Sequence, residues 1–267
     1  MKILRKIALI ATSLVCLCVF GGWTSASQGP VRYADAAIMS TRAAEQIHYT
    51  TKISDEYFIP YLAPMYSGVS GLTNCCGAVA GAIIVGYYDK YYPNMIEGWD
   101  SYYSSGRYRL QNSTYVNPLI TELYTLMRTN VDDVGVSEDD FVNGLETYIE
   151  GQGYNITMQD ALGSSLNYEA CKTAIDNNKV IALLSNPANV YDMSIVNEYD
   201  TVSSYYVNSG HIMVACGYRD VCYYDENGNM FRNDKYLYVC TGLDTLTGAY
   251  YKVNPHSLNA AYIVNIS

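Results

Sequence analysis

The stretch CCGAVAGAIIVGYYDKYYP, from Cys75 to Pro93, decides how the rest of the chain can fold. Apart from its glycines, its first half is apolar on every side, so a helix formed here must be buried all round. Gly81 and Gly86 lower helix propensity but allow neighbouring backbones to come close. Asn74 is a suitable N-cap and Pro93 cannot continue the helix, so the sequence predicts a central helix between them.

Further helical patterns follow this central helix. One helix is expected to open at Pro118, and residues 167–175 form another. Between them, Ser137 and Asp140 resemble a capping box for a helix that Gly151 ends. Strand patterns then fill the C-terminal half, at residues 180–184, 211–218, 236–241, 250–253 and 260–266. This order predicts an α+β fold, with an N-terminal helical half packed on a C-terminal antiparallel sheet.

The N-terminus has the pattern of a secretory signal peptide. Three positive charges precede the apolar run at residues 7–20, and small residues follow as far as Ser27. We therefore expect residues 1–27 to be removed on export, leaving a secreted protein without stable membrane association. An uncleaved N-terminal anchor is the alternative, although the run is short for a membrane span.

The remainder divides into an arm and one domain. Residues 28–55 are expected to be an N-terminal arm or a short pro-segment, in which the alanine-rich stretch 34–47 suggests a short helix. Residues 56–267 are expected to form the main domain. It starts with an extended run at 57–62, whose Pro60 suits a strand at a sheet edge.

Composition narrows the class of function. Of 267 residues, 49% are hydrophobic and 16% are charged, which is enough apolar material for one well-buried domain. The net charge is −10, and it becomes −13 without residues 1–27, which carry three positive and no negative charges. An acidic chain of this kind argues against nucleic-acid binding.

Cys76 and His211 have a pattern suited to covalent catalysis. Cys76 falls in the first turn of the predicted central helix, where the dipole favours a thiolate and a backbone amide can bind an oxyanion. His211 opens a predicted strand 135 residues later, within the spacing of about 130–150 residues typical of papain-like cysteine peptidases. Either residue alone more often has a structural role, but together they predict a nucleophile and its base.

The motifs around both residues resemble those of papain-like cysteine peptidases. Asn74–Gly77, Ala80–Ala82 and Gly86–Asp89 are similar to the family's nucleophile helix, and Gly210–His211 with Cys216–Tyr218 is similar to its histidine strand. The branch that looks closest is related to bacteriocin-leader (double-glycine) peptidases, in which the nucleophile directly precedes a glycine. That rule selects Cys76 rather than Cys75.

The resemblance spans residues 59–266. It implies a papain-like fold and hydrolysis of peptide bonds through a thioester acyl-enzyme, without a cofactor or metal. A peptide or protein is then the expected substrate, and a monomer the expected state. The substrate groove is expected to run between the helical half and the sheet, with a tyrosine-rich loop at residues 186–210 as its wall.

The resemblance is weaker for the residues that would bind the oxyanion and orient the histidine. The family's oxyanion glutamine has no counterpart between Leu62 and Cys76, so the amide of Asn74 is the nearest substitute. The family's histidine-orienting residue corresponds to Thr241, and Asp244 could reach back from the following turn.

These departures from the family pattern leave two alternatives to the peptidase. One is a catalytically impaired pseudoenzyme that binds peptides without turnover. The other is a wall-peptide hydrolase or acyl transferase on the same fold.

Overall fold

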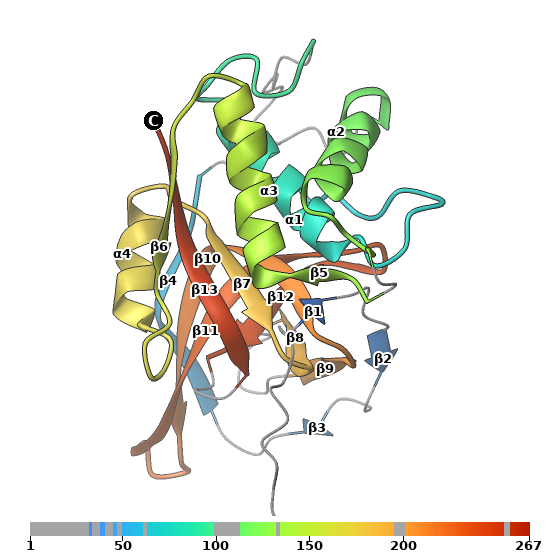
Figure 1. Ribbon diagram of the computed structural model, residues 1–267. Coiled ribbons are helices and arrows are strands. Elements are labelled where there is room, and N and C mark those ends of the chain that lie inside the picture. The colour runs from blue at the N-terminus through green and yellow to red at the C-terminus, as the bar shows by residue number, and fades with distance from the viewer. Residues whose placement is uncertain are drawn as a thin grey trace, which may run out of the picture.

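The helix expected between Asn74 and Pro93 is present, and it lies beside two further helices in the helical part of the structure (Figure 1). The computed structural model describes residues 32–33, 38–40, 45–46, 50–60, 63–98, 113–131, 134–194, 201–253 and 257–267. Helix α1 (Cys76–Tyr88) is buried along its whole length, as the absence of a polar face predicts. Its N-cap is Cys75 rather than Asn74, so that part of the prediction was wrong. Asn74 has a φ of 55° and lies in the turn before the helix.

Three further helices occur in the described part of the chain: α2 (Ser113–Leu126), α3 (Glu138–Gly151) and α4 (Tyr168–Asp176). Helices α2 and α3 pack against α1, whereas α4 packs on the sheet (Figure 1). Among the described residues, no helix is long and apolar enough to cross a membrane.

The observed ends of the helices can be compared with the predicted capping residues, glycine and proline. Ser137 accepts a hydrogen bond from the Asp140 N–H at 3.1 Å, and α3 ends at Gly151, both as predicted. Pro118, in contrast, lies inside α2 instead of opening it. The helix begins earlier because Val116, one turn before Ile120, extends the buried apolar stripe that packs on α1.

The strands form one large antiparallel sheet, which confirms the α+β class. Its order is β2-β9-β8-β12-β11-β10-β7-β13-β6, with β3 paired to β9 and β4 paired to β10. The strands are β2 (Ile38–Ser40), β3 (Glu45–Gln46), β4 (Thr50–Phe58), β6 (Ile156–Asp160), β7 (Ile181–Ser185), β8 (Ala188–Ser194), β9 (Thr201–Val207), β10 (His211–Tyr224), β11 (Met230–Leu243), β12 (Leu246–Lys252) and β13 (Leu258–Ile266). Separately, β1 (Arg32–Tyr33) pairs with β5 (Val136–Ser137).

The long strand β10 joins two parts of this sheet. Its first half, from His211 to Ala215, pairs with β7, and its second half, from Gly217 to Tyr224, pairs with β4. The change of partner coincides with a register shift between Ala215 and Gly217 against β11. A side chain at Gly217 would lie 2.6 Å from the Phe58 ring, so glycine is required where β4 arrives.

Several expectations for the N-terminal part and the loops need correction. Strand β4 begins at Thr50, so the boundary expected at residues 55 and 56 falls inside a strand of the sheet. Residues 38–40 and 45–46 are strands rather than part of a helix. The loop expected at 186–210 contains the paired strands β8 and β9. Residues 1–27 lie outside the described part of the chain.

Tyrosines at the C-terminal end of α1 connect this helix to its surroundings. The Tyr88 hydroxyl donates to the Val264 carbonyl of β13 at 2.6 Å, and the Tyr87 hydroxyl donates to the Asn178 carbonyl at 2.7 Å. Both side chains are buried, and both hydroxyls are hydrogen-bonded. Burial of these rings therefore leaves no hydroxyl unsatisfied, which is how a core can use so many tyrosines.

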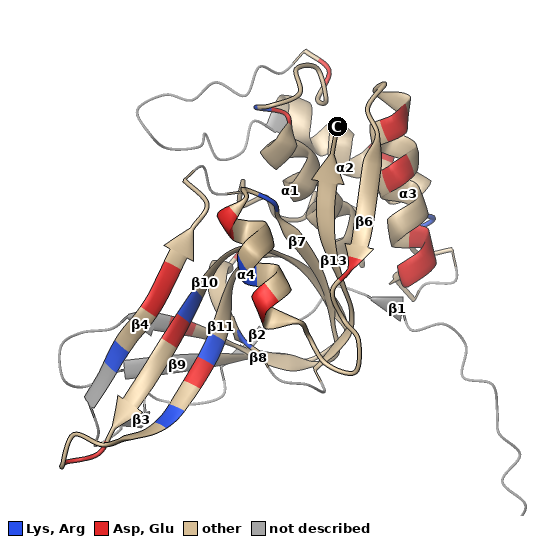
Figure 2. Ribbon diagram, turned by 90° about the vertical axis from the view of Figure 1, so that its left-hand side faces the viewer, with Lys and Arg blue, Asp and Glu red and all other residues tan. Residues whose placement is uncertain are grey.

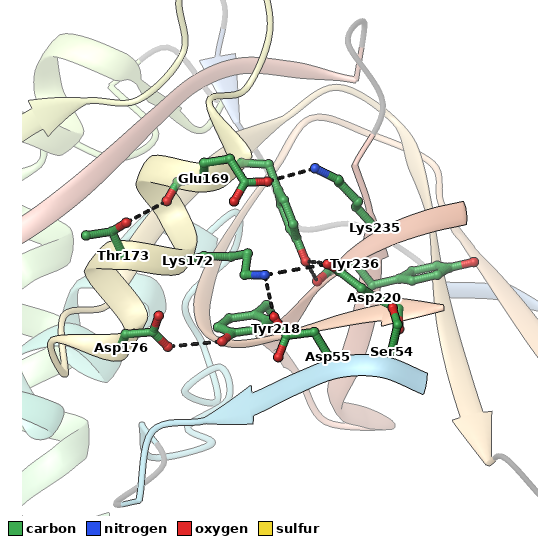
Figure 3. Close-up of polar contacts among 11 residues, drawn as sticks. Ser54, Asp55, Glu169, Lys172, Thr173, Asp176, Tyr218, Asp220, Lys235 and Tyr236 are labelled. Carbon is green, nitrogen blue, oxygen red and sulfur yellow. Dashed lines mark hydrogen bonds and ion pairs between the residues drawn. The ribbon is translucent and has the colours of Figure 1, made fainter. Parts of the chain in front are cut away.

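Charged side chains hold α4 against the sheet. Figure 2 shows charged positions of both signs on α4 and on the neighbouring strands β4, β10 and β11. Lys172 of α4 lies 2.5 Å from an Asp55 oxygen of β4 and 3.5 Å from an Asp220 oxygen of β10 (Figure 3). The Tyr168 hydroxyl also donates to Asp220. This cluster links the strand at the start of the domain to a helix more than a hundred residues later.

Candidate active site

Cys76 occupies the position that a helix dipole activates. It is the first residue of α1, and its side chain is only 3% exposed. The N–H groups of the first helical turn have no carbonyl partner within the helix, so they present partial positive charge near this thiol. These groups can stabilise a thiolate and can donate to an oxyanion that forms beside it.

Gly77 explains how this helix end fits into the core. A Cβ atom on Gly77 would lie 2.7 Å from the Val136 Cγ1 atom of β5. The glycine therefore allows the first turn of α1 to pack directly against β5, which holds Cys76 in place. Close packing against Val136 therefore explains why a glycine follows Cys76, and this explanation does not depend on catalysis.

Cys76 and His211 line the same pocket, which has a volume of about 430 Å³. Its walls come from the loop before α1, the start of α1, the start of β10 and the turn after β11. The lining residues are Gly68, Val69, Ser70, Gly71, Leu72, Cys75, Cys76, Val79, His211, Gly242, Leu243 and Asp244. The structure thus brings together residues that lie far apart in the sequence.

His211 has a defined tautomer in this pocket. It is the first residue of β10, its side chain is 1% exposed, and its backbone carbonyl accepts a hydrogen bond from Ser185 Oγ at 3.1 Å. Its Nε2 atom lies 2.7 Å from the Thr241 carbonyl oxygen. Because a carbonyl can only accept, Nε2 carries the proton, and in the neutral ring Nδ1 carries the lone pair. His211 can therefore act as a base through Nδ1.

Thr241 contacts His211 through its backbone and not through its side chain. The Thr241 hydroxyl donates to the Leu246 carbonyl and accepts from the Leu243 N–H at 3.2 Å. These bonds close the turn between β11 and β12. Next to it, Gly242 has a φ of +74° and a Cβ atom there would lie 3.1 Å from Val79 of α1. The position of the carbonyl is thus set by a tight turn packed against α1.

Asp244 lies in the pocket wall in a different role from the one predicted. It is exposed, and it is the one carboxylate among the described lining residues. Within the described part of the chain, no hydrogen bond or ion pair joins Asp244 to His211, whose Nε2 is held by Thr241. Of the two residues predicted to orient the histidine, Thr241 is the one in contact with the ring, through its backbone carbonyl.

The side-chain amide of Asn74 is hydrogen-bonded to Asn130, and Asn74 is outside the described lining of the pocket. Its Nδ2 atom donates to Asn130 Oδ1 at 2.6 Å, and Asn130 in turn donates to Thr73 Oγ1 at 2.9 Å. Asn74 is not among the described residues that line the pocket. This arrangement is at odds with the predicted oxyanion role of Asn74 and leaves the first-turn amides of α1 as the donors closest to Cys76 along the chain.

The sequence analysis did not identify two parts of this site. The loop at residues 68–72 forms one wall, and its only signal was a run rich in glycine and serine. Cys75 lines the pocket beside Cys76, although the motif had selected only the second cysteine. Of the tyrosines expected in the groove wall, Tyr191 instead packs against a small hydrophobic cluster formed by Val221, Tyr223, Tyr236 and Tyr250.

The part of the chain that the structure describes contains no cluster of three or more His, Cys, Asp or Glu side chains able to hold a metal ion. In comparisons with known proteins, no family model matches the chain, and neither a curated protein nor a solved structure matches it.

Proposed function

We propose that this protein is a secreted cysteine peptidase with a papain-like fold. One observation carries the proposal: a cysteine at the N-terminus of a buried helix shares a pocket with a histidine whose Nε2 is held by a carbonyl. This arrangement leaves Nδ1 of His211 as the base for Cys76. The motif resemblance described above supports the same fold and reaction.

The first half of the reaction forms a thioester. His211 Nδ1 takes the proton from the Cys76 thiol, and the thiolate attacks the carbonyl carbon of a peptide bond. The negative oxygen of the tetrahedral intermediate is stabilised by N–H groups of the first turn of α1. When the intermediate collapses, the protonated His211 gives its proton to the leaving amine.

The second half returns the enzyme to its starting state. His211 takes a proton from water, and the resulting hydroxide attacks the thioester carbonyl. The carbon–sulfur bond then breaks, the peptide acid is released and Cys76 recovers its proton from His211. The Thr241 carbonyl orients the ring throughout and favours its protonated form by a dipole rather than by a full negative charge.

Export and substrate class belong to the same proposal. The signal-peptide pattern at residues 1–27 supports secretion, and the net charge of −13 that remains supports a soluble protein without stable membrane association. The substrate is a peptide or protein, the protein acts as a monomer, and the chemistry requires no cofactor.

Selective alkylation tests the proposal without knowledge of the substrate. Purified mature protein is treated with limiting iodoacetamide between about pH 5 and pH 9, and each cysteine is read by peptide mass spectrometry. Cys171 is the internal reference, because burial raises the pKa of its thiol to about 12. We expect Cys76 to be labelled first at acidic pH and to lose this advantage in His211→Ala. Equal labelling of Cys76 and the other cysteines would refute a catalytic pair.

A peptide-binding pseudoenzyme is the second candidate. It is favoured by the backbone carbonyl that stands in place of a carboxylate next to His211, and by the engagement of Asn74 with Asn130. If Cys76 shows the His211-dependent labelling but a broad peptide library shows binding without cleavage, the pseudoenzyme becomes the better account.

A further inference from the structure

The proposed reaction uses one thiol, but the pocket contains two. Cys75 and Cys76 are neighbours in the chain, both side chains are buried, with 4% and 3% exposed, and both line the pocket. The Cys75 sulfur faces Gly68, where an added Cβ atom would lie only 3.2 Å away. Among the described lining residues these are the only two cysteines.

We infer that Cys75 is a resolving thiol, which converts Cys76 oxidised by a hydroperoxide into a reversible Cys75–Cys76 disulfide. The inference rests on the proposed function in one respect, namely that Cys76 is a reactive thiolate. It adds a covalent modification site and a second chemical role for the pocket, with hydrogen peroxide or an alkyl hydroperoxide as the reactant.

The chemistry balances in two steps. The Cys76 thiolate attacks the terminal peroxide oxygen, so that a sulfur–oxygen bond forms and the oxygen–oxygen bond breaks; hydroxide leaves from hydrogen peroxide, or alkoxide from an alkyl hydroperoxide. The Cys75 sulfur then attacks the Cys76 sulfur, forming the sulfur–sulfur bond and expelling the oxygen, which leaves as water with the Cys75 proton. The two thiols together lose two electrons; hydrogen peroxide is reduced to two waters, and an alkyl hydroperoxide to an alcohol and one water.

A disulfide between the adjacent residues Cys75 and Cys76 is expected to be easily reduced, because of the backbone geometry. Adjacent Cα atoms are about 3.8 Å apart, closer than the roughly 4.4–6.8 Å usual for disulfides, so the bond is strained and easily reduced. Cys75 lies at the N-cap with φ −88° and ψ 10°, and its side chain makes no capping hydrogen bond. Its carbonyl accepts a hydrogen bond from the Val79 N–H at 2.9 Å, so closing the disulfide is expected to strain the first turn of α1 as well.

A strained disulfide also protects the nucleophile. Without a nearby thiol, the sulfenic acid of Cys76 reacts further with peroxide to a sulfinic acid, which common reductants do not reverse. The other described cysteines are placed elsewhere: Cys171 on α4, Cys216 and Cys222 on β10, and Cys240 on β11. Cys75 is thus the cysteine positioned to intercept the oxidised Cys76.

Mass spectrometry of the reduced, full-length mature protein tests this inference. The tryptic fragment from Ile53 to Lys90 contains both cysteines and no other. After hydrogen peroxide, we expect this fragment to be two hydrogen atoms lighter, to resist iodoacetamide and to be restored by dithiothreitol. In Cys75→Ser, we expect a sulfinic acid on Cys76 and loss of this recovery. Cys171→Ser, which changes a buried thiol outside the pocket, is the matched control and should behave like wild type.

Two results would overturn the inference. One is a sulfinic acid on Cys76 in the wild type, with no disulfide. The other is a lighter fragment that persists in Cys75→Ser, because the cross-link would then involve a backbone nitrogen. Iodoacetamide labelling before peroxide separates the two proposals. Fast labelling of Cys76 without a disulfide refutes only the resolving thiol, whereas slow labelling of Cys76 refutes the proposed catalytic function.

Discussion

At the scale of single residues, the imidazole of His211 is held by a backbone carbonyl and not by a carboxylate. The Thr241 carbonyl accepts from Nε2 of His211, while the Thr241 hydroxyl is used within its own turn. The tautomer of the histidine is therefore set by main-chain geometry. The side chain of Thr241 matters for the turn, and its carbonyl matters for the site.

This division of roles predicts the behaviour of Thr241→Val. The substitution keeps the carbonyl and the side-chain shape but removes two hydrogen bonds, so we expect a loss of about 1–2 kcal/mol in the free energy of unfolding. The preferential labelling of Cys76 should persist, as measured by the alkylation experiment and by urea denaturation. If Thr241→Val abolishes that preference as fully as His211→Ala does, the hydroxyl has a direct role and the carbonyl account is wrong.

Among the described residues that line the pocket, Asp244 is the one Asp, Glu, Lys or Arg, so it supplies the pocket with a negative charge. A thiol reagent with a positive charge should therefore reach Cys76 faster than a negative one of the same size. In Asp244→Asn, we expect the cationic reagent to label Cys76 more slowly and the anionic reagent to label it faster. Each rate should change by about two- to three-fold, the Coulomb effect of one unit charge roughly 7 Å away in water. Cationic and anionic methanethiosulfonates measure this ratio. An unchanged ratio would show that the carboxylate does not act on the pocket.

At the scale of elements, α1 is stable because of its neighbours and not because of its own sequence. It contains three glycines, has no polar face and is buried along its whole length. Such a helix gains its stability from burial against α2, α3 and β10, which it contacts along its length. The position of Cys76 consequently depends on how closely those elements approach.

Gly77→Ala tests this dependence. Its Cβ atom would meet Val136 at 2.7 Å, so we expect a loss of about 1–3 kcal/mol from overpacking, measured by denaturant unfolding. Gly151→Ala is the matched control, because a Cβ there meets nothing within 4 Å and the residue ends α3. The control should be neutral or slightly stabilising. Adding Val136→Ala to Gly77→Ala should restore part of the loss, and no restoration would contradict the packing explanation.

At the scale of the whole molecule, long-range charge pairs connect parts that the chain order separates. Lys172 joins α4 to β4 and to β10, and the side chains of Lys172 and Asp220 are 16% and 13% exposed (Figure 3). Lys235 of β11 and Glu169 of α4 form a second pair between the sheet and this helix, but their side chains are 42% and 70% exposed. Both pairs join α4 to the sheet, but the Lys172–Asp220 pair is largely buried and the Lys235–Glu169 pair is exposed.

Lys172→Met should therefore lower the free energy of unfolding by about 1–2 kcal/mol, whereas Lys235→Met should change it little. Burial lowers the pKa of Lys172, but its hydrogen bond to Asp55 and the charges of Asp220 and Asp55 outweigh this effect, and the pKa lies above 10.5. The stabilisation is thus fully present below the ordinary pKa and is lost as the pH rises through the raised one. Denaturation of both variants at neutral and alkaline pH measures it, and equal losses would contradict the role of burial.

Local signals predicted much of the helical half. The buried central helix, the cap at Ser137 and the end of α3 at Gly151 follow from short-range patterns of apolar, capping and glycine residues. The placement of Pro118 was wrong because proline marks a helix start only as a tendency, and buried neighbours extended α2 beyond it. Such signals act over a few residues and cannot report distant packing.

Contacts between distant segments account for the other errors. Strand β4 pairs with β10, which lies more than 150 residues later, so its true start at Thr50 was not visible in its own sequence. Asn74 turns toward Asn130, 56 residues away, instead of capping α1. The histidine partner at Thr241 is a backbone carbonyl, and because every residue has one, no sequence pattern could single it out.

The sequence by itself determined that the central helix is buried, that helices combine with a largely C-terminal antiparallel sheet, and which thiol and imidazole are candidates for chemistry. These conclusions follow from apolar periodicity and residue type, which are properties of the chain. Only the tertiary structure decided that Cys76 and His211 share a pocket, that Cys75 lies beside them and that the Thr241 carbonyl contacts the ring. These depend on strand register and close packing, in which small differences in position decide which atoms meet.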